Sequence, residues 1–379
     1  MNTDLVQALL LQSKACAYLG SAFHADLLNY AAADLEAGGA VTMLLAPWAQ
    51  ADAKAIMAAA VPLRLLGALH DLVLSGEDPA LSASYPRPGQ ATDAQAAWRQ
   101  AARAITERQA QLATFMQHEP QTNEVRRSVC LLGGFLTIAQ ETGLPLRCFE
   151  IAASAGLNLS WDRYRYSLGD VAWGPDSPVH LPTDWSGPLP PMDAKVVVIE
   201  RAACDRRPVD ITDPIQRRRL LAYVWPDQFE RLERLRAAID LALALNIKVE
   251  TADAVEWTAR TAGPAPGAAT VIYHSVFWQY MPPERSGHAP ATGPRDAARE
   301  PGGPTQDHRI SRRPRHRPGP AGLAAHGAAA GKHGRDGSPP HPLAGRRGTD
   351  PGRCPSARRL GSVARPRLED AQSIISSSG

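Results

Sequence analysis

The stretch Leu146-Arg147-Cys148-Phe149-Glu150-Ile151-Ala152-Ala153-Ser154-Ala155-Gly156 decides the fold class of this chain. Its first six residues are mostly apolar and indicate a buried β-strand, and the five that follow are all small and end in glycine. A strand that runs directly into such a turn is typical of the first βα unit of a parallel sheet. Small residues in that turn let a ligand approach the backbone closely. We therefore expect an α/β fold with a ligand-binding turn at residues 152–156.

Three further strands are predicted downstream of this turn, at residues 195–200, 247–251 and 269–273. An amphipathic helix that begins at Phe229 separates the second strand from the third, and another helix precedes Gly143. Strands that alternate with helices imply βαβ units and a parallel sheet. The predicted architecture of residues 121–284 is a Rossmann-like α/β domain.

Residues 1–120 are expected to form a helical N-terminal subdomain. Leucine-rich stripes recur at helical spacing, Gly76 is expected to end one helix and Asp93 to cap another. His70 lies inside a leucine-rich helix, where a histidine that is hydrogen-bonded within the core is the expected reading.

The segment 285–379 contains no Phe, Trp, Tyr or Met, yet holds 15 of the 30 glycines and 13 of the 33 prolines. Such a composition predicts a disordered tail, because little apolar surface is there to be buried. The tail has 17 Lys and Arg against 7 Asp and Glu, so that of the whole-chain charge of +3 the preceding residues carry −7. It is either a basic arm that binds anions or the product of out-of-frame translation of a GC-rich gene, and the abrupt change favours the second.

The bulk composition excludes several classes of protein. Residues 1–284 carry a net negative charge, so no nucleic-acid partner is expected for them. The sequence contains no run of 18 apolar residues, so no membrane span is expected. Five cysteines without a CxxC pair argue against a disulfide framework and against a zinc site, so no metal is expected. The N-terminus lacks the pattern of a signal peptide, and a cytoplasmic location is expected.

Four candidate groups follow the carboxyl ends of the predicted strands: the turn 152–156, Glu200, Asp253 and His274. Ligands bind at this edge of a parallel sheet. An acid after the second strand can bind both ribose hydroxyls, and an acid after the third can accept from an adenine amino group. The pattern is that of an adenosine site.

The run from Phe149 to Gly156 resembles the first motif of Rossmann-like S-adenosylmethionine methyltransferases, an acid followed by G-x-G-x-G. The resemblance implies that Glu150 holds the methionine amino group through the turn, and that Glu200 and Asp253 bind ribose and adenine. Only the third glycine of the motif is present. The cofactor-binding set that this implies is Glu150, Ala152, Ser154, Gly156, Asn158, Glu200 and Asp253.

A wider resemblance covers residues 10 to 284. The blocks 121–128, 150–158, 161–164, 223–228 and 274–280 resemble, in order, those of a bacterial family called domain-of-unknown-function family 2332. Members of that family usually carry glycine where this chain has Ala152. They also continue past the fourth strand with folded sequence, which agrees with the out-of-frame reading of the tail. The family name implies no activity.

The predicted function is therefore a methyltransferase-like protein that binds S-adenosylmethionine, with an unknown small-molecule acceptor. His274 or Tyr280 is the expected catalytic base. The residues expected to bind the acceptor are Asn123, Glu124, Arg126, Trp161, Arg163 and Tyr164.

Two alternatives stay open. Ala152-x-Ser154-x-Gly156 is close to the G-x-S-x-G elbow of serine hydrolases, and Ser154, Asp253 and His274 follow the hydrolase order. Alternatively, the small residues serve close packing only, and the protein is a non-catalytic or degenerate scaffold of the same fold.

Overall fold

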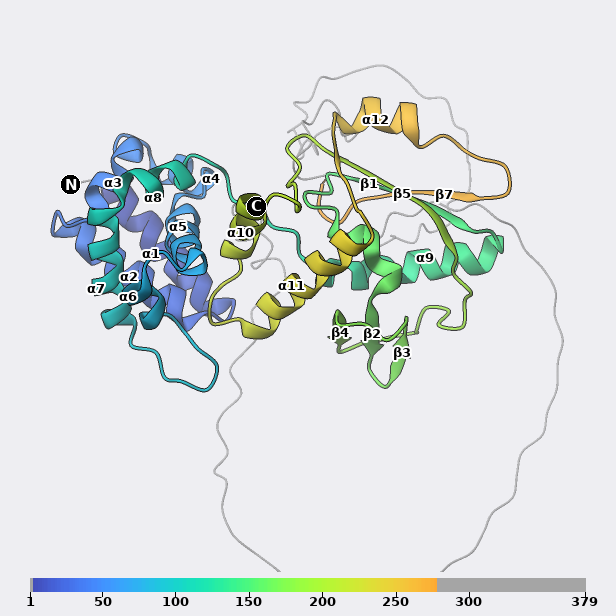
Figure 1. Ribbon diagram of the computed structural model, residues 1–379, viewed down its shortest axis with the longest axis horizontal. Helices are drawn as coiled ribbons and strands as arrows, with labels where there is room; N and C mark the ends of the chain where they lie inside the picture. The colour runs from blue at the N-terminus through green and yellow to red at the C-terminus, as the bar shows by residue number, and fades with distance from the viewer. Residues whose placement is uncertain (1–2, 278–379) are drawn as a thin grey trace, which may run out of the picture. The chain divides into compact units, whose positions relative to one another are not determined.

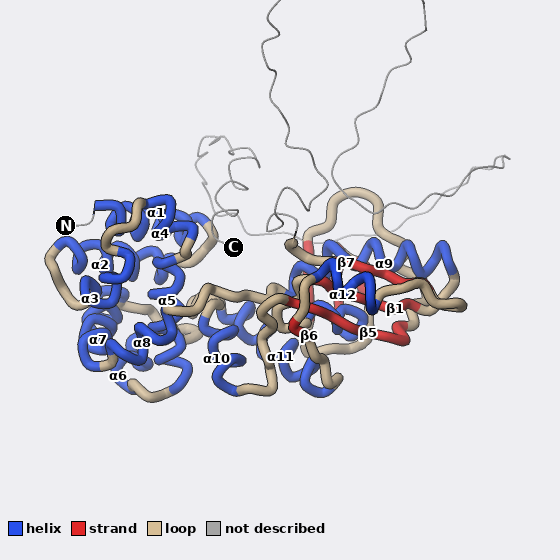
Figure 2. Tube along the Cα trace, turned by 90° about the horizontal axis from the view of Figure 1, so that it is seen from above, coloured by secondary structure: helices blue, strands red, loops and turns tan. Residues whose placement is uncertain are grey.

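A computed structural model describes residues 3–277, whose helices and strands are drawn in Figures 1 and 2. The predicted base Tyr280 and the predicted tail 285–379 lie outside the described residues. Within residues 3–277, none of the helices is both long and apolar enough to cross a lipid bilayer.

The N-terminal part is helical, as predicted. Asp93 caps α7 by accepting a hydrogen bond from the Ala96 amide (3.0 Å), and Gly76 ends α5 with a φ of 72°. The inward faces of these helices form one apolar core. The helices are α1 (Thr3–Tyr18), α2 (Ala22–Glu36), α3 (Val41–Leu45), η1 (Ala46–Trp48), α4 (Ala53–Ala58), α5 (Val61–Ser75), α6 (Pro79–Ser84), α7 (Ala94–Glu107) and α8 (Gln109–Met116).

The second part contains a parallel sheet of four strands in the order β6-β5-β1-β7. β1 (Leu146–Ile151) and β7 (Ala269–Tyr273) have the predicted bounds, whereas β5 is Val198–Asp205 and β6 is only Glu250–Thr251. The chain moves from β1 through β5 to β6 on one side, and then crosses to place β7 on the other side of β1. Such a reversal is a topological switch point, at which open α/β sheets bind ligands. The predicted α/β fold with a parallel sheet is confirmed.

Helices cover both faces of this sheet (Figure 1). One face is covered by α9 (Ser128–Thr142), which follows η2 (Val125–Arg127), and by α11 (Phe229–Ala244); the alternate β1 residues Leu146 and Cys148 belong to this core. The other face meets α12 (Ala254–Thr261), where Phe149 packs edge-on against Trp257 at 6.1 Å between ring centroids. Successive side chains of β1 therefore point to opposite faces of the sheet and pack in two separate cores.

The segment between β1 and β5 forms a small subdomain that the sequence reading did not predict. After η3 (Leu157–Arg163), the strands β2 (Arg165–Leu168), β3 (Val171–Trp173) and β4 (His180–Thr183) make a three-stranded sheet in the order β3-β2-β4. Trp161 stacks on Phe135 of α9 at 4.0 Å and faces Trp173 at 5.8 Å, which fixes this insertion to the main core.

The predicted bounds of the second strand are wrong. Residues 195–197 precede the strand, which begins at Val198 and continues past Glu200 to Asp205. Charged residues are accepted in its middle because each has a partner: Glu200 pairs with Arg147 on β1, and Arg201 pairs with Asp162 at 2.6 Å. The strand therefore ends five residues later than its charge pattern suggests.

The helical part contacts the α/β part through α10 (Pro214–Ala222). Arg218 of α10 pairs with Asp71 of α5 at 2.9 Å. His70 is buried, with its Nδ1 3.1 Å from the Ala222 carbonyl oxygen, so the expected core role of this histidine is confirmed. Burial lowers the pKa of His70 to about 4, which leaves the ring neutral at physiological pH.

Candidate functional site

The turn after β1 adopts a left-handed backbone at alternate residues. The φ angles are 53° at Ala152, 55° at Ser154 and 71° at Gly156. These are the three positions that glycines fill in a G-x-G-x-G turn, and here two of them carry side chains at a steric cost. The backbone therefore has a positive φ at all three glycine positions of the motif, although the sequence matches that motif only at its last position.

Hydrogen bonds from neighbouring segments hold this turn in place. The Ala153 amide donates to the Cys204 carbonyl at 3.1 Å, and the Ser154 amide donates to the Asp205 carboxylate at 2.8 Å. On the far side, the Leu157 amide donates to the Asn123 side-chain oxygen at 2.9 Å. Buried amides are satisfied in this way, so the strained backbone is fixed by β5 and by the segment before α9.

Gly156 is required by space as well as by its φ angle. A Cβ atom on this residue would lie 2.8 Å from Val249 and 3.0 Å from Ile247, which lead into β6. The third glycine position is thus where the turn touches the neighbouring crossover.

Replacing Ala152 by glycine is expected to stabilise the fold. A left-handed alanine costs about 1 kcal/mol, and the greater freedom of glycine in the unfolded chain offsets part of the gain. We expect the free energy of unfolding in urea to rise by roughly 0.5 kcal/mol. Ala153→Gly is the matched control at a neighbouring residue without a positive φ, and it should lower stability by about 1 kcal/mol. Equal losses in both variants would contradict the strain assigned to Ala152.

Asp205 is the acid at the carboxyl end of the second strand. One carboxylate oxygen accepts from the Ser154 amide and the other from the Arg207 amide, each at 2.8 Å. Each oxygen retains a second lone pair, so Asp205 can both anchor the turn and accept further hydrogen bonds from a ligand. Glu200, the acid predicted for this position, lies in the middle of β5 and does not line the cleft described next.

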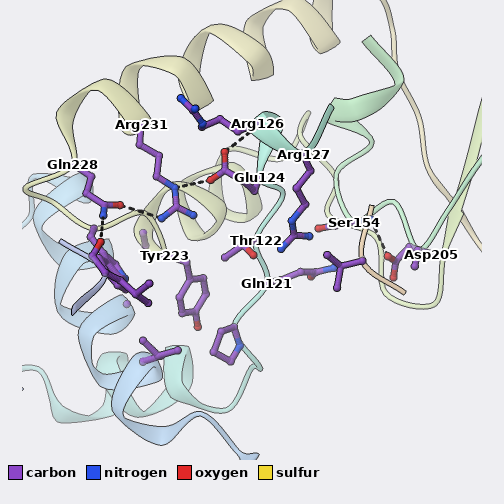
Figure 3. Close-up of a pocket in the computed structure, with 18 of the residues that line it drawn as sticks. Gln121, Thr122, Glu124, Arg126, Arg127, Ser154, Asp205, Tyr223, Gln228 and Arg231 are labelled. Atoms are coloured by element: carbon purple, nitrogen blue, oxygen red, sulfur yellow. Dashed lines mark hydrogen bonds and ion pairs between the residues drawn. The ribbon is translucent and has the colours of Figure 1, made fainter. Parts of the chain in front are cut away.

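A cleft of about 1530 Å³ opens in front of the turn. Ala152, Ser154, Asp205 and Asp253 line it at the carboxyl ends of the strands, and residues of α5 and α11 line other walls. Figure 3 shows Arg127 directed toward Ser154 and Asp205, with Glu124, Arg126 and Arg231 beside it. A space of this size can hold a nucleoside cofactor together with a second small molecule.

Glu150 lies in the core and does not line the cleft. It is 0% exposed, and no hydrogen bond from the described residues reaches either carboxylate oxygen. Burial raises the pKa of Glu150 to about 8, opposed in part by Asn158 and by Arg127. Asn158 is also fully buried, and burial raises the pKa of the nearby Tyr164 and Tyr273. Glu150 is thus a protonated core carboxyl at neutral pH.

The residues predicted to bind the acceptor separate into two groups. Glu124 and Arg126 line the cleft, whereas Asn123 is buried behind it and anchors the turn. Trp161 and Tyr164 are 0% exposed and belong to the core of the insertion, with the Tyr164 hydroxyl donating to the Leu157 carbonyl. The exposed Arg163 pairs with Asp162 outside this cleft. Of these six residues, only Glu124 and Arg126 line the cleft in front of the predicted cofactor turn, and Asn123 holds the turn from the other side.

The described residues show no hydrogen-bonded catalytic triad. Ser154 Oγ is buried without a hydrogen-bond partner, and the Asp253 carboxylate caps α12 by accepting from the Val255 amide at 3.0 Å. His274 follows β7 at a half-buried position outside the cleft lining, and burial lowers its pKa. Ser154 does share the left-handed backbone of a nucleophile elbow.

Several cleft residues were missed in the sequence reading. Asp205 follows the apolar run 202–204, which is the signal that the strand extends beyond Glu200. His24, in α2, lines the cleft with both ring nitrogens unpartnered among the described residues, and burial lowers its pKa well below the ordinary range. No local motif marks His24, because only the tertiary packing of α2 brings it to the cleft.

Within residues 3–277, no three or more His, Cys, Asp or Glu side chains lie together in a group that could hold a metal ion.

Comparison with known protein families gives a match over most of the described residues. The family model described as an uncharacterized protein conserved in bacteria (DUF2332) matches residues 6–293. No curated protein and no solved structure matches the chain.

Proposed function

This chain belongs to the bacterial family DUF2332, whose description states no activity, and from the cleft we propose that it binds S-adenosylmethionine and acts as a methyltransferase-like protein. The observation that carries the proposal is the turn 152–156, which has a left-handed backbone and lies at the switch point of the parallel sheet β6-β5-β1-β7. This is where Rossmann-like folds bind nucleoside cofactors.

The cleft residues fit such a cofactor. Asp205 ends the strand next to the turn and presents carboxylate lone pairs, which suits the two hydroxyls of a ribose. Asp253 follows β6 and lines the same cleft, where an acid suits an adenine amino group. Ser154 also lines the cleft, and its buried hydroxyl has no hydrogen-bond partner among the described residues.

S-Adenosylmethionine would supply an activated methyl group on a sulfonium sulfur. The chain's own contribution is then to orient the two substrates and to exclude water, because methyl transfer depends mainly on positioning in a dry site. The assignment of His274 or Tyr280 as a base stays a prediction, and so does the identity of the acceptor.

Titration of S-adenosylhomocysteine into the full chain by calorimetry tests the proposal. We expect micromolar binding by the wild type and about 10- to 100-fold weaker binding by Asp205→Asn, because charge-assisted hydrogen bonds to the ribose are lost. Glu200→Gln is the matched control on the same strand and should bind like the wild type. Absence of heat with a wild type shown to be folded by circular dichroism sinks the proposal.

A serine hydrolase is the second candidate, favoured only by the left-handed, unpartnered Ser154. Labelling with a fluorophosphonate separates the two candidates. The methyltransferase proposal expects no adduct, whereas an adduct on the wild type that is absent from Ser154→Ala would establish the hydrolase.

A further inference from the structure

Three arginines gather on one wall of the cleft. Arg231 and Arg234 lie three residues apart on α11 and therefore share a face of that helix, and Arg126 approaches them from η2. All three line the cleft that also contains Asp205. Figure 3 shows Arg126 and Arg231 on either side of Glu124.

The carboxylate of Glu124 satisfies only one of these guanidinium groups. Its Oε2 accepts from Arg231 Nε at 2.7 Å, and its Oε1 accepts from the Arg126 backbone amide at 3.0 Å. Gln228 Oε1 accepts a further hydrogen bond from Arg231 at 3.0 Å. Arg231 is thereby held in place, and Glu124 acts as its positioning residue.

The other two arginines have donors to spare. Arg126 donates to the Pro182 carbonyl at 3.0 Å and forms no ion pair among the described residues. Arg234 makes neither a hydrogen bond nor an ion pair with any described residue, and its Nε is buried. Glu230 also lines the cleft, and both Glu230 and Arg126 are exposed, whereas Arg234 is half-buried. A buried, unpaired guanidinium N–H is costly, so a ligand that pairs with it gains affinity.

The pKa of Arg234 agrees with this geometry. Burial lowers it most. The carboxylates of Glu124 and Glu230 act against that change, and the neighbouring charges of Arg126 and Arg231 lower the pKa further. On this wall, Arg126, Arg231 and Arg234 stand against the two carboxylates of Glu124 and Glu230, which leaves one positive charge among these five residues.

We infer that the second substrate of this cleft is a small anion whose carboxylate or phosphate group is bound by Arg126 and Arg234. The inference rests on the proposed function, because it describes the methyl acceptor that sits beside the cofactor. Guanidinium groups match both kinds of oxyanion through paired N–H donors. Arg126 and Arg234 provide such donors, because not all of their N–H groups are hydrogen-bonded, and the neighbouring Arg231 is held in place by Glu124.

Calorimetric titration at low ionic strength tests the inference, with sodium pyrophosphate and sodium citrate as separate probes. We expect the wild type to bind one of them, and Arg126→Gln and Arg234→Gln each to weaken that binding about 10-fold. Arg236→Gln is the matched control, because Arg236 lies on the same helix but pairs with Glu233 at 2.6 Å and does not line the cleft. Tighter binding of pyrophosphate indicates a phosphate-bearing acceptor, and tighter binding of citrate a carboxylate-bearing one.

The inference is overturned if a folded wild type binds neither anion, or if Arg236→Gln weakens binding as much as Arg234→Gln does. Titration of S-adenosylhomocysteine into the same variants keeps the two ideas separate. Anion binding that depends on Arg234 in a protein that binds no nucleoside would retain the anion site and remove the proposed methyl transfer.

Discussion

Glu150→Gln is expected to unfold at a higher urea concentration than the wild type at pH 9, and at the same concentration near pH 4.5. Burial raises the pKa of Glu150 from its ordinary value of 4.5 to about 8. Below pH 4.5 the carboxyl is protonated in both states. Between pH 4.5 and pH 8 the carboxyl releases its proton only in the unfolded chain, so the free energy of unfolding of the wild type falls as the pH rises. Glutamine cannot ionise, and the variant escapes this loss.

The stability difference should reach roughly 3–5 kcal/mol at pH 9, which is the order of magnitude of such a pKa difference in free energy. Urea unfolding followed by circular dichroism between pH 4.5 and 9 measures it. Glu141→Gln, at an exposed position near the end of α9, serves as the control and should show no such pH dependence. A Glu150→Gln variant that is less stable at every pH would mean that the carboxylate is ionised and paired in the folded protein.

The fold could be predicted from the sequence wherever the local pattern was decided by burial. β1 and β7 have the predicted bounds because their apolar runs are bordered by turn residues, and Asp93 caps its helix through a purely local hydrogen bond. The end of β5 could not be found in this way. Glu200 and Arg201 look like the end of a strand unless their partners Arg147 and Asp162, distant in sequence, are known.

The candidate site shows the same division. Motif positions 152, 154 and 156 placed the turn correctly, since its left-handed backbone is a local property. Which acid of β5 lines the cleft could not be read from the local sequence, because it depended on where β5 ends. Glu150 was assigned to the cofactor by its place in the motif, but the alternation of β1 directs it to the same core as Cys148.

Arginines 231 and 234 illustrate a second limit. On the sequence of α11 they look like the solvated face of an amphipathic helix, which is the usual position of charged residues. Packing against segments distant in sequence, η2 among them, makes that face part of a cleft wall. Conversely, aromatic residues of the insertion looked suited to a substrate pocket, although the three-stranded sheet buries them.

Trp161→Ala is expected to lower the free energy of unfolding by about 3–5 kcal/mol, the cost of removing a large buried aromatic side chain. Trp161 is 0% exposed and stacks on Phe135 with 4.0 Å between ring centroids, so the truncation leaves a cavity between α9 and the insertion. Urea unfolding measures the loss. Trp185→Ala, at a half-buried position after β4, is the matched control and should cost about 1 kcal/mol.

The same variant distinguishes a packing role from substrate binding. If Trp161 only packs, the folded fraction of Trp161→Ala below its melting temperature should bind S-adenosylhomocysteine and the preferred anion with wild-type affinity. A variant that keeps wild-type stability but loses anion binding would return Trp161 to the acceptor site that the sequence predicted. The packing favours the first outcome, because Trp161 is 0% exposed and its indole ring already stacks on Phe135 and Trp173.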